Sequence, residues 1–388
     1  MRVKLKDAFN LQMGKTPSRA DLSMWGGNNK WISIADIGSA KKYISSTKEC
    51  ITDEGVSRSG IKVVPEGTVI MSFKLSIGKT AIVSEDMYTN EAIMAFIDNG
   101  TYCIDPNYLY HLCCGTDWTQ GGNKAVMGLT LNKATLSEME IELPTIEEQR
   151  GIASILDQLD AIIEKRHDEL NMIEQLVKSR FIELFGTVTE NPYGFPMATL
   201  KEVCHKITDG KHGGCEQEAD SGYYYVGARE IYDDCIHYDT APQITYADFA
   251  KDYKRCNIER GDMVIVNTGA TIGKTAIASS PLTERTLLQK SVALLKVKTE
   301  IISAEFLRHC YMANPSMYRV ESASAQPNLL LSRMNATRIY LPPIDLQEQF
   351  AAFVEQTDKS KYFACQTLSF LLKLANNLQS WREKQYDY

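Results

Sequence analysis

The sequence predicts an α+β protein in which two similar, mixed β-rich globular domains are separated by two long antiparallel α-helices. Three observations lead to this prediction: motifs recur along the chain, two stretches carry apolar residues at helical spacing over roughly thirty residues, and the segments before them combine β-like runs with turns. The helices would form a coiled-coil-like spacer with a pseudo-twofold internal repeat. We divide the chain into globular domains at 1–145 and 187–343 and long helices at 146–186 and 344–388.

Two motifs carry the internal repeat. The hexapeptide I-G-K-T-A-I stands at residues 77–82 and again at 272–277. The heptapeptide L-P-T-I-E-E-Q at 143–149 is matched by L-P-P-I-D-L-Q at 341–347, and the similarity continues without a gap beyond both. Such self-similarity predicts two copies of one structural unit.

The globular segments contain short strands separated by turns. Residues 62–73 show a Pro/Gly turn followed by an apolar run, and residues 257–266 repeat that layout. Further strands are predicted at 223–227 and 291–297, and a short helix at 303–313.

Each globular segment is followed by a long helix. The first begins after Pro144, where Glu147 and Glu148 suit the positive end of the helix dipole, and Gly186 ends it. The second runs from about residue 345 to residue 381. Since neither apolar stripe can be buried alone, we expect the helices to pair as a rigid antiparallel spacer. The alternative is that each helix packs only on its own globular domain.

Composition limits the functional class only loosely. The formal net charge of −7 and the pI of about 5.6 argue against a nucleic-acid binder, although local basic patches, or a partner, can supply the phosphate contacts. The ten cysteines form no C-x-x-C pair, so we expect reduced thiols in a cytoplasmic protein and no zinc site. No apolar run is long enough to predict a membrane helix.

No catalytic motif is complete. The G-K-T at 78–80 and 273–275 resembles the end of a phosphate-binding loop, but it lacks the required glycine spacing and leads into a strand-like run instead of a helix. The N-P-Y-G at 191–194 resembles a damaged amino-methylase motif and is better explained as a linker turn. We therefore expect no catalytic, cofactor-binding or metal-binding residue in this chain.

Two pairs of glycine-rich loops have the composition of DNA-contacting loops. They lie at 14–19 and 25–37 in the first half and at 209–213 and 225–231 in the second. Bare backbone can approach DNA closely, and amide, guanidinium and ammonium groups bond phosphates and base edges. Solvated loop side chains, and core packing of the two tryptophans, are the alternatives. The candidate contacts are Lys15, Arg19, Trp25, Trp31, Lys211, His212 and Arg229.

Together these segments resemble the specificity subunit of type I restriction–modification systems. In the first half the resemblance rests on G-K-T-P-S-R, W-G-G, E-G-T-V-I-M-S and L-P-T-I-E-E-Q. In the second it rests on T-D-G-K-H-G, V-N-T-G-A-T-I-G-K-T-A-I, Q-P-N-L-L-L-S and L-P-P-I-D-L-Q-E-Q-F. It covers nearly the whole chain and is weakest in the middle of each half.

The resemblance implies a DNA-recognition subunit without catalysis. Each half would read one part of a split double-stranded DNA target, while the helices set the gap and dock two methyltransferase subunits. Restriction/translocase subunits would join them, and S-adenosylmethionine, ATP and magnesium would sit on the partner subunits only. The first half has no clear Q-x-N-L-S, and Asn123-Lys124 is its nearest equivalent. The resemblance adds as DNA-binding candidates Ser72, Lys74, Asn123, Lys124, Asn267, Thr268, Gly269, Gln326 and Asn328.

Two other functions fit parts of the sequence. A two-domain protein-interaction scaffold without a DNA role would agree with the acidic pI and the lack of catalytic motifs. A self-contained restriction enzyme would need nuclease and methylase motifs, which the sequence lacks.

Overall fold

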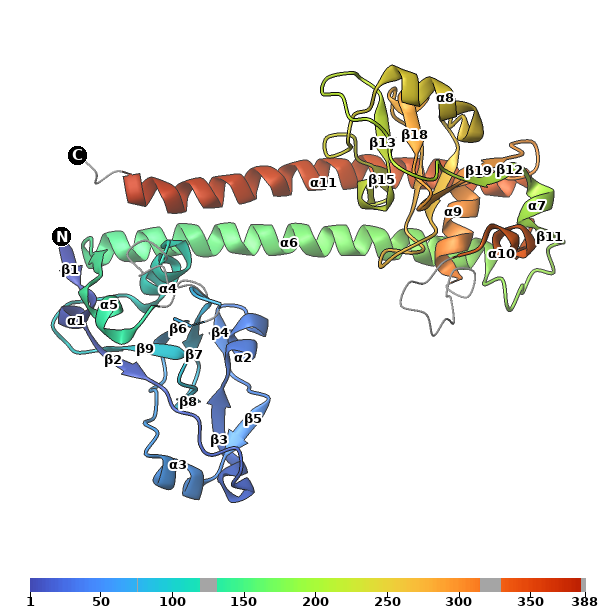
Figure 1. Cartoon of the computed structure of the whole chain (residues 1–388). Coiled ribbons are helices and arrows are strands. Elements are labelled where there is room, and N and C mark those ends of the chain that lie inside the picture. The colour runs from blue at the N-terminus through green and yellow to red at the C-terminus, as the bar shows by residue number, and fades with distance from the viewer. Residues whose placement is uncertain (75, 119–130, 315–328, 385–388) are drawn as a thin grey trace. The chain divides into compact units, whose positions relative to one another are not determined.

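The chain forms two compact units (Figure 1). This computed structural model describes residues 1–74, 76–118, 131–314 and 329–384. The first unit contains residues 1–167 and the chain from 366 onward, and the second contains residues 168–365. Each unit therefore holds one globular half with part of each of two long helices, α6 (Ile146–Phe185) and α11 (Ile344–Lys384).

The first unit is built on a five-stranded sheet of order β2-β9-β6-β7-β4, beside a three-stranded sheet of order β5-β3-β8 and the pair β1-β10. The contacts β4–β7 and β3–β8 are parallel and the others antiparallel. The elements are β1 (Arg2–Lys4), α1 (Leu5–Ala8), β2 (Phe9–Met13), η1 (Leu22–Met24), β3 (Trp25–Ile32), α2 (Ile34–Ser39), β4 (Tyr43–Ile44), β5 (Glu49–Ile51), α3 (Asp53–Ser59), β6 (Val69–Ser72), β7 (Thr80–Val83), β8 (Tyr88–Thr89), β9 (Ile93–Asp98), α4 (Pro106–Gly115), α5 (Lys133–Glu138) and β10 (Glu140–Glu142).

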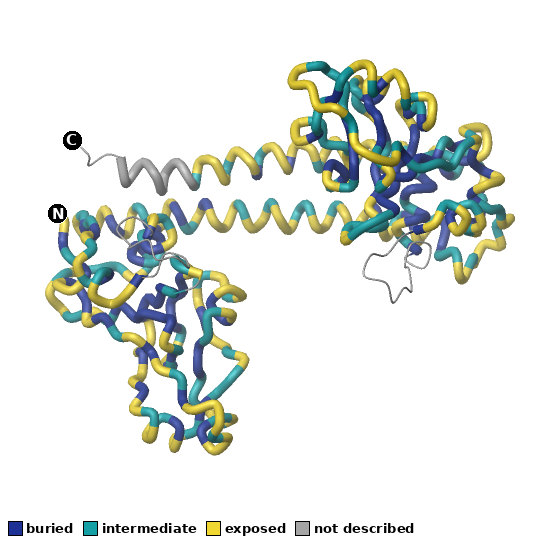
Figure 2. The backbone as a smooth tube through the Cα atoms, in the orientation of Figure 1, coloured by how far each residue is buried: buried dark blue, intermediate teal, exposed yellow. Residues whose placement is uncertain are grey.

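The central strands of this sheet are buried on both faces. Successive residues of a strand point to opposite sides, so Val69 and Met71 enter one apolar cluster while Ile70 enters another. Helix α4 adds Tyr108 and Leu109 to the first cluster. Figure 2 shows the buried residues concentrated along these strands. Two-sided burial explains why the strands read as continuous apolar runs in the sequence.

The second unit has a four-stranded sheet of order β12-β19-β16-β17 and the pairs β13-β18, β14-β15 and β11-β20. Only β13–β18 is parallel. The elements are β11 (Met197–Thr199), α7 (Leu200–Val203), β12 (Cys204–Asp209), β13 (Tyr224–Val226), η2 (Ala228–Glu230), β14 (Ile231–Tyr232), β15 (Cys235–Ile236), α8 (Tyr246–Cys256), β16 (Met263–Val266), β17 (Thr275–Ile277), η3 (Thr283–Arg285), β18 (Thr286–Leu288), β19 (Val292–Val297), α9 (Ala304–Ala313), α10 (Leu331–Ala336) and β20 (Arg338–Tyr340).

The two halves share one strand topology. The order β2-β9-β6-β7 in the first half recurs as β12-β19-β16-β17 in the second. The parallel pair β3-β8 corresponds to β13-β18, and the pair β1-β10 to β11-β20. The repeat seen in two sequence motifs therefore extends through the dissimilar middle of each half. The predicted strands and the short helix near residue 303 are present.

Both long helices are present where the sequence predicts them. Thr145 and Glu148 cap the start of α6: the Thr145 N–H donates to the Glu148 carboxylate at 2.9 Å. Gly186, with φ +70°, ends the helix. In the second unit the last turns of α6 pack antiparallel to the first turns of α11, where Phe181 and Phe350 have ring centroids 5.4 Å apart. Among the described residues, none of the helices combines the length and apolar character needed to cross a membrane.

Candidate nucleic-acid interface

In the first half, the predicted contacts gather around residues 89–92, which we call the first central loop. The N–H of Phe73 donates to Ala92 O at 3.0 Å, which joins the turn between β6 and β7 to this loop. Gly14 packs against it so closely that a Cβ would lie 2.0 Å from Thr89 O. Only glycine permits this approach, so the Gly14 loop and the β6–β7 turn meet at one edge of the sheet.

The second half repeats this joint around residues 289–291, the second central loop. A Cβ at Gly210 would lie 2.2 Å from Leu288 O, just before the loop. The N–H of Asn267 donates to Ser291 O at 3.0 Å and brings in the turn between β16 and β17. The two halves thus assemble equivalent loops by equivalent backbone contacts.

Arg19 is held in a fixed orientation on the first half. Its guanidinium lies 3.8 Å from the centre of the Trp25 ring and 5.1 Å from that of Trp31. Glu49 accepts two hydrogen bonds from it, at 2.5 and 2.9 Å, and these bonds lower the pKa of Glu49. The Arg19 side chain is still 54% exposed. Trp31 Nε1 donates to Lys15 O at 3.0 Å, which joins the cluster to the Lys15 loop. The Arg19 guanidinium is therefore held in one orientation beside that loop.

Lys15 and Lys74 are available cations. The Lys15 ammonium donates to Ser59 O at 3.2 Å, and that of Lys74 lies 5.2 Å from the centre of the Phe73 ring. Neither forms an ion pair with a carboxylate in the described ranges. Both can therefore face a phosphate without first breaking an ion pair.

Three of the candidates for DNA contact are buried in the folded chain. Trp31, Ser72 and Asn267 are exposed by only 2%, 0% and 4%. The Ser72 hydroxyl accepts from the Lys79 N–H at 3.1 Å and donates to a carbonyl in the same turn, while Asn267 O accepts from the Leu329 N–H at 2.7 Å. The Ser72 side chain and the Asn267 backbone thus hold their loops in place from inside the fold.

Lys211 and His212 are already engaged by carboxylates. The Lys211 ammonium lies 2.7 Å from Asp252, and this hydrogen bond raises the pKa of Lys211. His212 Nε2 lies 2.9 Å from Asp209, which also binds Arg255. Burial opposes ionisation of Asp209, but the bonds from Arg255 and His212 outweigh it and lower its pKa. Lys211 must therefore exchange a carboxylate for a phosphate to contact DNA.

Arg229 is the freest of the predicted cations in the second half. It is exposed and pairs with no acidic residue within the part of the chain that the structure describes. Its neighbour Ala228 donates its N–H to the Ser291 hydroxyl at 3.3 Å, so Arg229 stands beside the second central loop. Gly269 has φ +100° on the adjoining turn, and Thr268 donates to Asn267 Oδ1 at 3.2 Å. The predicted residues Asn123, Lys124, Gln326 and Asn328 lie outside the described residues.

Three exposed lysines at these loops were not predicted: Lys79, Lys274 and Lys290. Lys79 and Lys274 occupy the same position of the repeated I-G-K-T-A-I, a signal that the sequence offered. Lys290 stands in the second central loop, whereas the first carries Glu91, which binds Thr16. The centres of the two loops therefore differ in charge.

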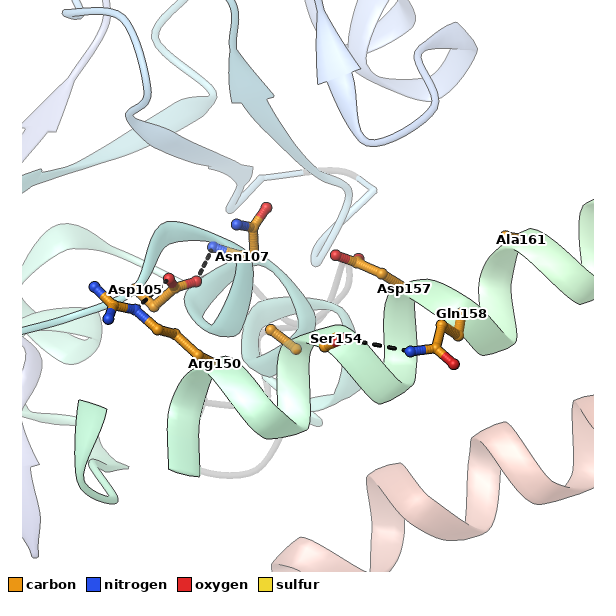
Figure 3. A pocket seen from close by; sticks show the side chains of 8 residues that line it. Asp105, Asn107, Arg150, Ser154, Asp157, Gln158 and Ala161 are labelled. Atoms are coloured by element: carbon orange, nitrogen blue, oxygen red, sulfur yellow. Dashed lines mark hydrogen bonds and ion pairs between the residues drawn. The ribbon is translucent and has the colours of Figure 1, made fainter. Parts of the chain in front are cut away.

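A polar cavity of about 370 Å³ lies where α6 begins against α4 (Figure 3). Asp105, which caps α4, faces Arg150 of α6 at 3.8 Å. Ser154 and Gln158 line the same face of α6, and their side chains are joined by a hydrogen bond of 3.4 Å. Within the described residues, no group of three or more His, Cys, Asp and Glu is arranged to hold a metal ion.

A buried histidine links the globular half to α6. His111 on α4 is 2% exposed, and its Nε2 lies 2.7 Å from Asp157 of α6. Asp157 also pairs with Lys42 at 2.5 Å, and Asp160 lies 3.9 Å from the other ring nitrogen. Burial lowers the pKa of His111 and outweighs the attraction of both carboxylates. His111, Asp157 and Lys42 thus join α4 and the globular half to α6.

Comparison with known proteins connects this geometry to a family. The family model described as the type I restriction modification DNA specificity domain matches residues 1–175 and again 192–363. The chain is 23% identical to the type I restriction enzyme MjaIX specificity subunit of Methanocaldococcus jannaschii, over 91% of this chain and 85% of that protein. It is 27% identical to the EcoR124I/EcoR124II specificity subunit of Escherichia coli, over 38% of each chain.

Solved structures show the same fold. The S subunit of a type I restriction–modification system from M. genitalium superposes with a TM-score of 0.59 at 16% identity, covering 98% of this chain and 94% of that one. A chain from a study of complex assembly and conformational transition of the type I R-M system gives a TM-score of 0.60 at 18% identity, covering 98% and 96%.

Proposed function

Because this chain belongs to the type I restriction–modification DNA specificity family, we propose that it recognises a bipartite DNA target, with one recognition domain for each part. It is a DNA-recognition subunit and not the catalytic one. S-adenosylmethionine, ATP and magnesium belong to the partner subunits in this proposal. The four-part division into residues 1–145, 146–186, 187–343 and 344–388 is the domain organisation that it assumes.

The duplicated loop joint is the observation that carries the proposal. Gly14 and Gly210 make equivalent close contacts at corresponding sheet edges of the two halves, and each half adds exposed cations there. Cationic and amide side chains on such loops are the groups that contact phosphates and base edges. Two such edges in one chain would read two separate stretches of duplex. The difference between Glu91 and Lys290 supports different sequences for the two.

The long helices would hold the two readers apart. At about 1.5 Å per residue, the 40 residues of α6 span about 60 Å. The antiparallel contact of Phe181 and Phe350 supports a coiled-coil-like spacer with pseudo-twofold symmetry. Such a spacer would fix the gap between the two DNA sequences.

Exposed apolar side chains on the helices support docking of two methyltransferase subunits, which the restriction/translocase subunits would join. Ile155 and Ile162 are 61% and 45% exposed on the first unit, and Met172 and Leu176 are 66% and 52% exposed on the second. Large apolar side chains grouped on one helix are typical of interfaces with partners. The polar cavity beside Arg150 lies on the same helix.

Selection from a random duplex library tests the proposal. The full chain, alone and with its methyltransferase partners, should enrich two defined sequence blocks separated by a gap of fixed length. The chain alone should not methylate the selected DNA. Recovery of DNA without any common sequence, together with normal assembly of the protein complex, would identify the chain as a protein-interaction scaffold instead.

A further inference from the structure

The second unit contains a cationic cavity away from the central loops. It has a volume of about 330 Å³ and lies between the segment that follows α6 and the end of α10. Arg333 and Arg338 line it, on either side of Thr337, with Thr189 and Asn314 opposite. Among the residues that the structure describes, no acidic side chain lines the cavity. The cavity therefore carries positive charge although the chain as a whole has a net charge of −7.

Both guanidinium groups are available to a ligand. Arg333 and Arg338 are exposed, and neither bonds a carboxylate in the described part of the chain. Thr199 pairs with Arg338 across β11 and β20, which brings Glu202 into this region. The Glu202 carboxylate is already engaged, because it accepts from the Thr199 N–H at 2.7 Å in the cap of α7. Hydrogen bonds from Thr199 lower the pKa of Glu202, and Arg338 adds to this only through space.

The walls of the cavity are fixed by buried hydrogen bonds. The Asn314 side chain is 6% exposed, accepts from the Val188 N–H at 3.1 Å and donates to Cys310 O at 2.6 Å. The Thr337 hydroxyl donates to Arg333 O at 3.0 Å. Because the Asn314 and Thr337 side chains already form hydrogen bonds within the protein, the charge of the two guanidinium groups determines which ligand the cavity would bind.

We propose that this cavity binds a phosphate group between Arg333 and Arg338, and that the phosphate belongs to the DNA backbone outside the bases that are read. The planar guanidinium matches phosphate oxygens with paired N–H donors. The cavity belongs to the same domain as the second central loop, because α10 follows directly after Leu329, whose N–H donates to Asn267 O. The inference rests on the proposed function, since it needs duplex DNA on this domain.

Arg333→Gln and Arg338→Gln, each made in the full chain, test the site. Each change should weaken binding to target and non-target duplexes alike, roughly tenfold at low salt, and should reduce the slope of log affinity against log salt by about one. Arg260→Gln is the matched control, because Arg260 is an exposed arginine of the same domain that already pairs with Glu284 at 3.0 Å. It should leave both quantities near those of the parent chain.

Inorganic phosphate provides the second arm. At matched ionic strength, phosphate should raise the melting temperature of the parent chain more than chloride does, and this difference should be smaller in both variants. The two variants should keep only the general salt effect, whereas Arg260→Gln should show site binding in addition to it. If the variants lose phosphate binding while duplex binding and its salt slope are unchanged, the cavity takes free phosphate, and the assignment to DNA is overturned. If the variants equal the parent chain both in duplex binding and in their response to phosphate, or if they differ only in assembly with partner subunits, the site is refuted. Failure of the parent chain to bind any duplex would refute the proposed function. The melting temperatures in phosphate would then still show whether the cavity binds a phosphate group.

Discussion

Gln149 and Gln347 make the same three hydrogen bonds in the two halves of the chain. The Gln149 side chain accepts from the N–H of Asp105 at 2.9 Å, and that of Gln347 accepts from the N–H of Ser303 at 2.9 Å. Each amide also donates to two carbonyls, one of them in the proline turn before its own long helix. The repeated motif therefore joins the start of each long helix to the globular half that precedes it.

Replacing Gln149 by Leu should destabilise the first unit. The side chain is 1% exposed, so its replacement buries an apolar group in a polar site and removes the partner of three partly buried backbone groups. We expect a loss of roughly 2–4 kcal/mol in the free energy of unfolding. Chemical denaturation measures it. Gln158→Leu is the control, because Gln158 is exposed on the same helix, and it should change stability little. Equal effects of the two changes would contradict the role of the joint.

Stability should fall below neutral pH because of His111. Its pKa in the folded chain is below the ordinary value of 6.5, so the unfolded chain takes up the proton first as the pH falls. The contribution of neutral His111 to stability is fully present above about pH 6.5, and it is lost as the pH falls from there to the lower pKa of His111 in the folded chain. The depressed pKa of Asp157 acts only at lower pH.

His111→Gln should reduce this pH dependence. Melting temperatures at about pH 7.5 and about pH 5.5 should differ by less in the variant than in the parent chain. His167→Gln, an exposed position on α6, should keep the parent difference. A parent chain that melts at the same temperature at both pH values would show that the joint does not titrate.

The two recognition sites should be separable by mutation. Arg19→Ala should weaken recognition of one half of the target, and Arg229→Ala that of the other, each roughly tenfold. Binding to duplexes with one half scrambled at a time measures this separation. If each change weakened binding to both halves equally, two independent readers would be excluded.

The helices should act as a ruler. One extra turn of four residues in both helices, after residue 167 in α6 and after residue 365 in α11, adds about 6 Å to the spacer. The preferred gap should lengthen by about two base pairs of roughly 3.4 Å while the half-site sequences stay the same. These places avoid Val177 and Phe181, which are buried in the second core. A library of gap lengths checks the optimum, and an unchanged optimum at normal affinity would rule out the ruler.

The sequence placed the candidate residues in loops but could not show which of them are exposed. Glycines at 14 and 210 were recognised in loops that could approach a ligand, and both do pack at equivalent places. Ser72 and Asn267 were predicted to contact DNA, yet both are buried. Lys290 was missed because it follows an apolar strand in a region without a repeated motif. Whether a loop residue faces solvent depends on contacts with distant segments, which local pattern does not encode.

The sequence by itself determined the duplication, the strand and helix types and the two long helices, because periodicity, turn residues and repeated motifs are local properties. Tertiary structure alone decided which cations are free. Lys15 and Lys211 hold similar places in the repeat, but only Lys211 lies beside Asp252, a residue brought in by α8. The first half has α3 and β5 instead. Electrostatic partners act over a few ångströms in space, and only the folded chain brings those residues together.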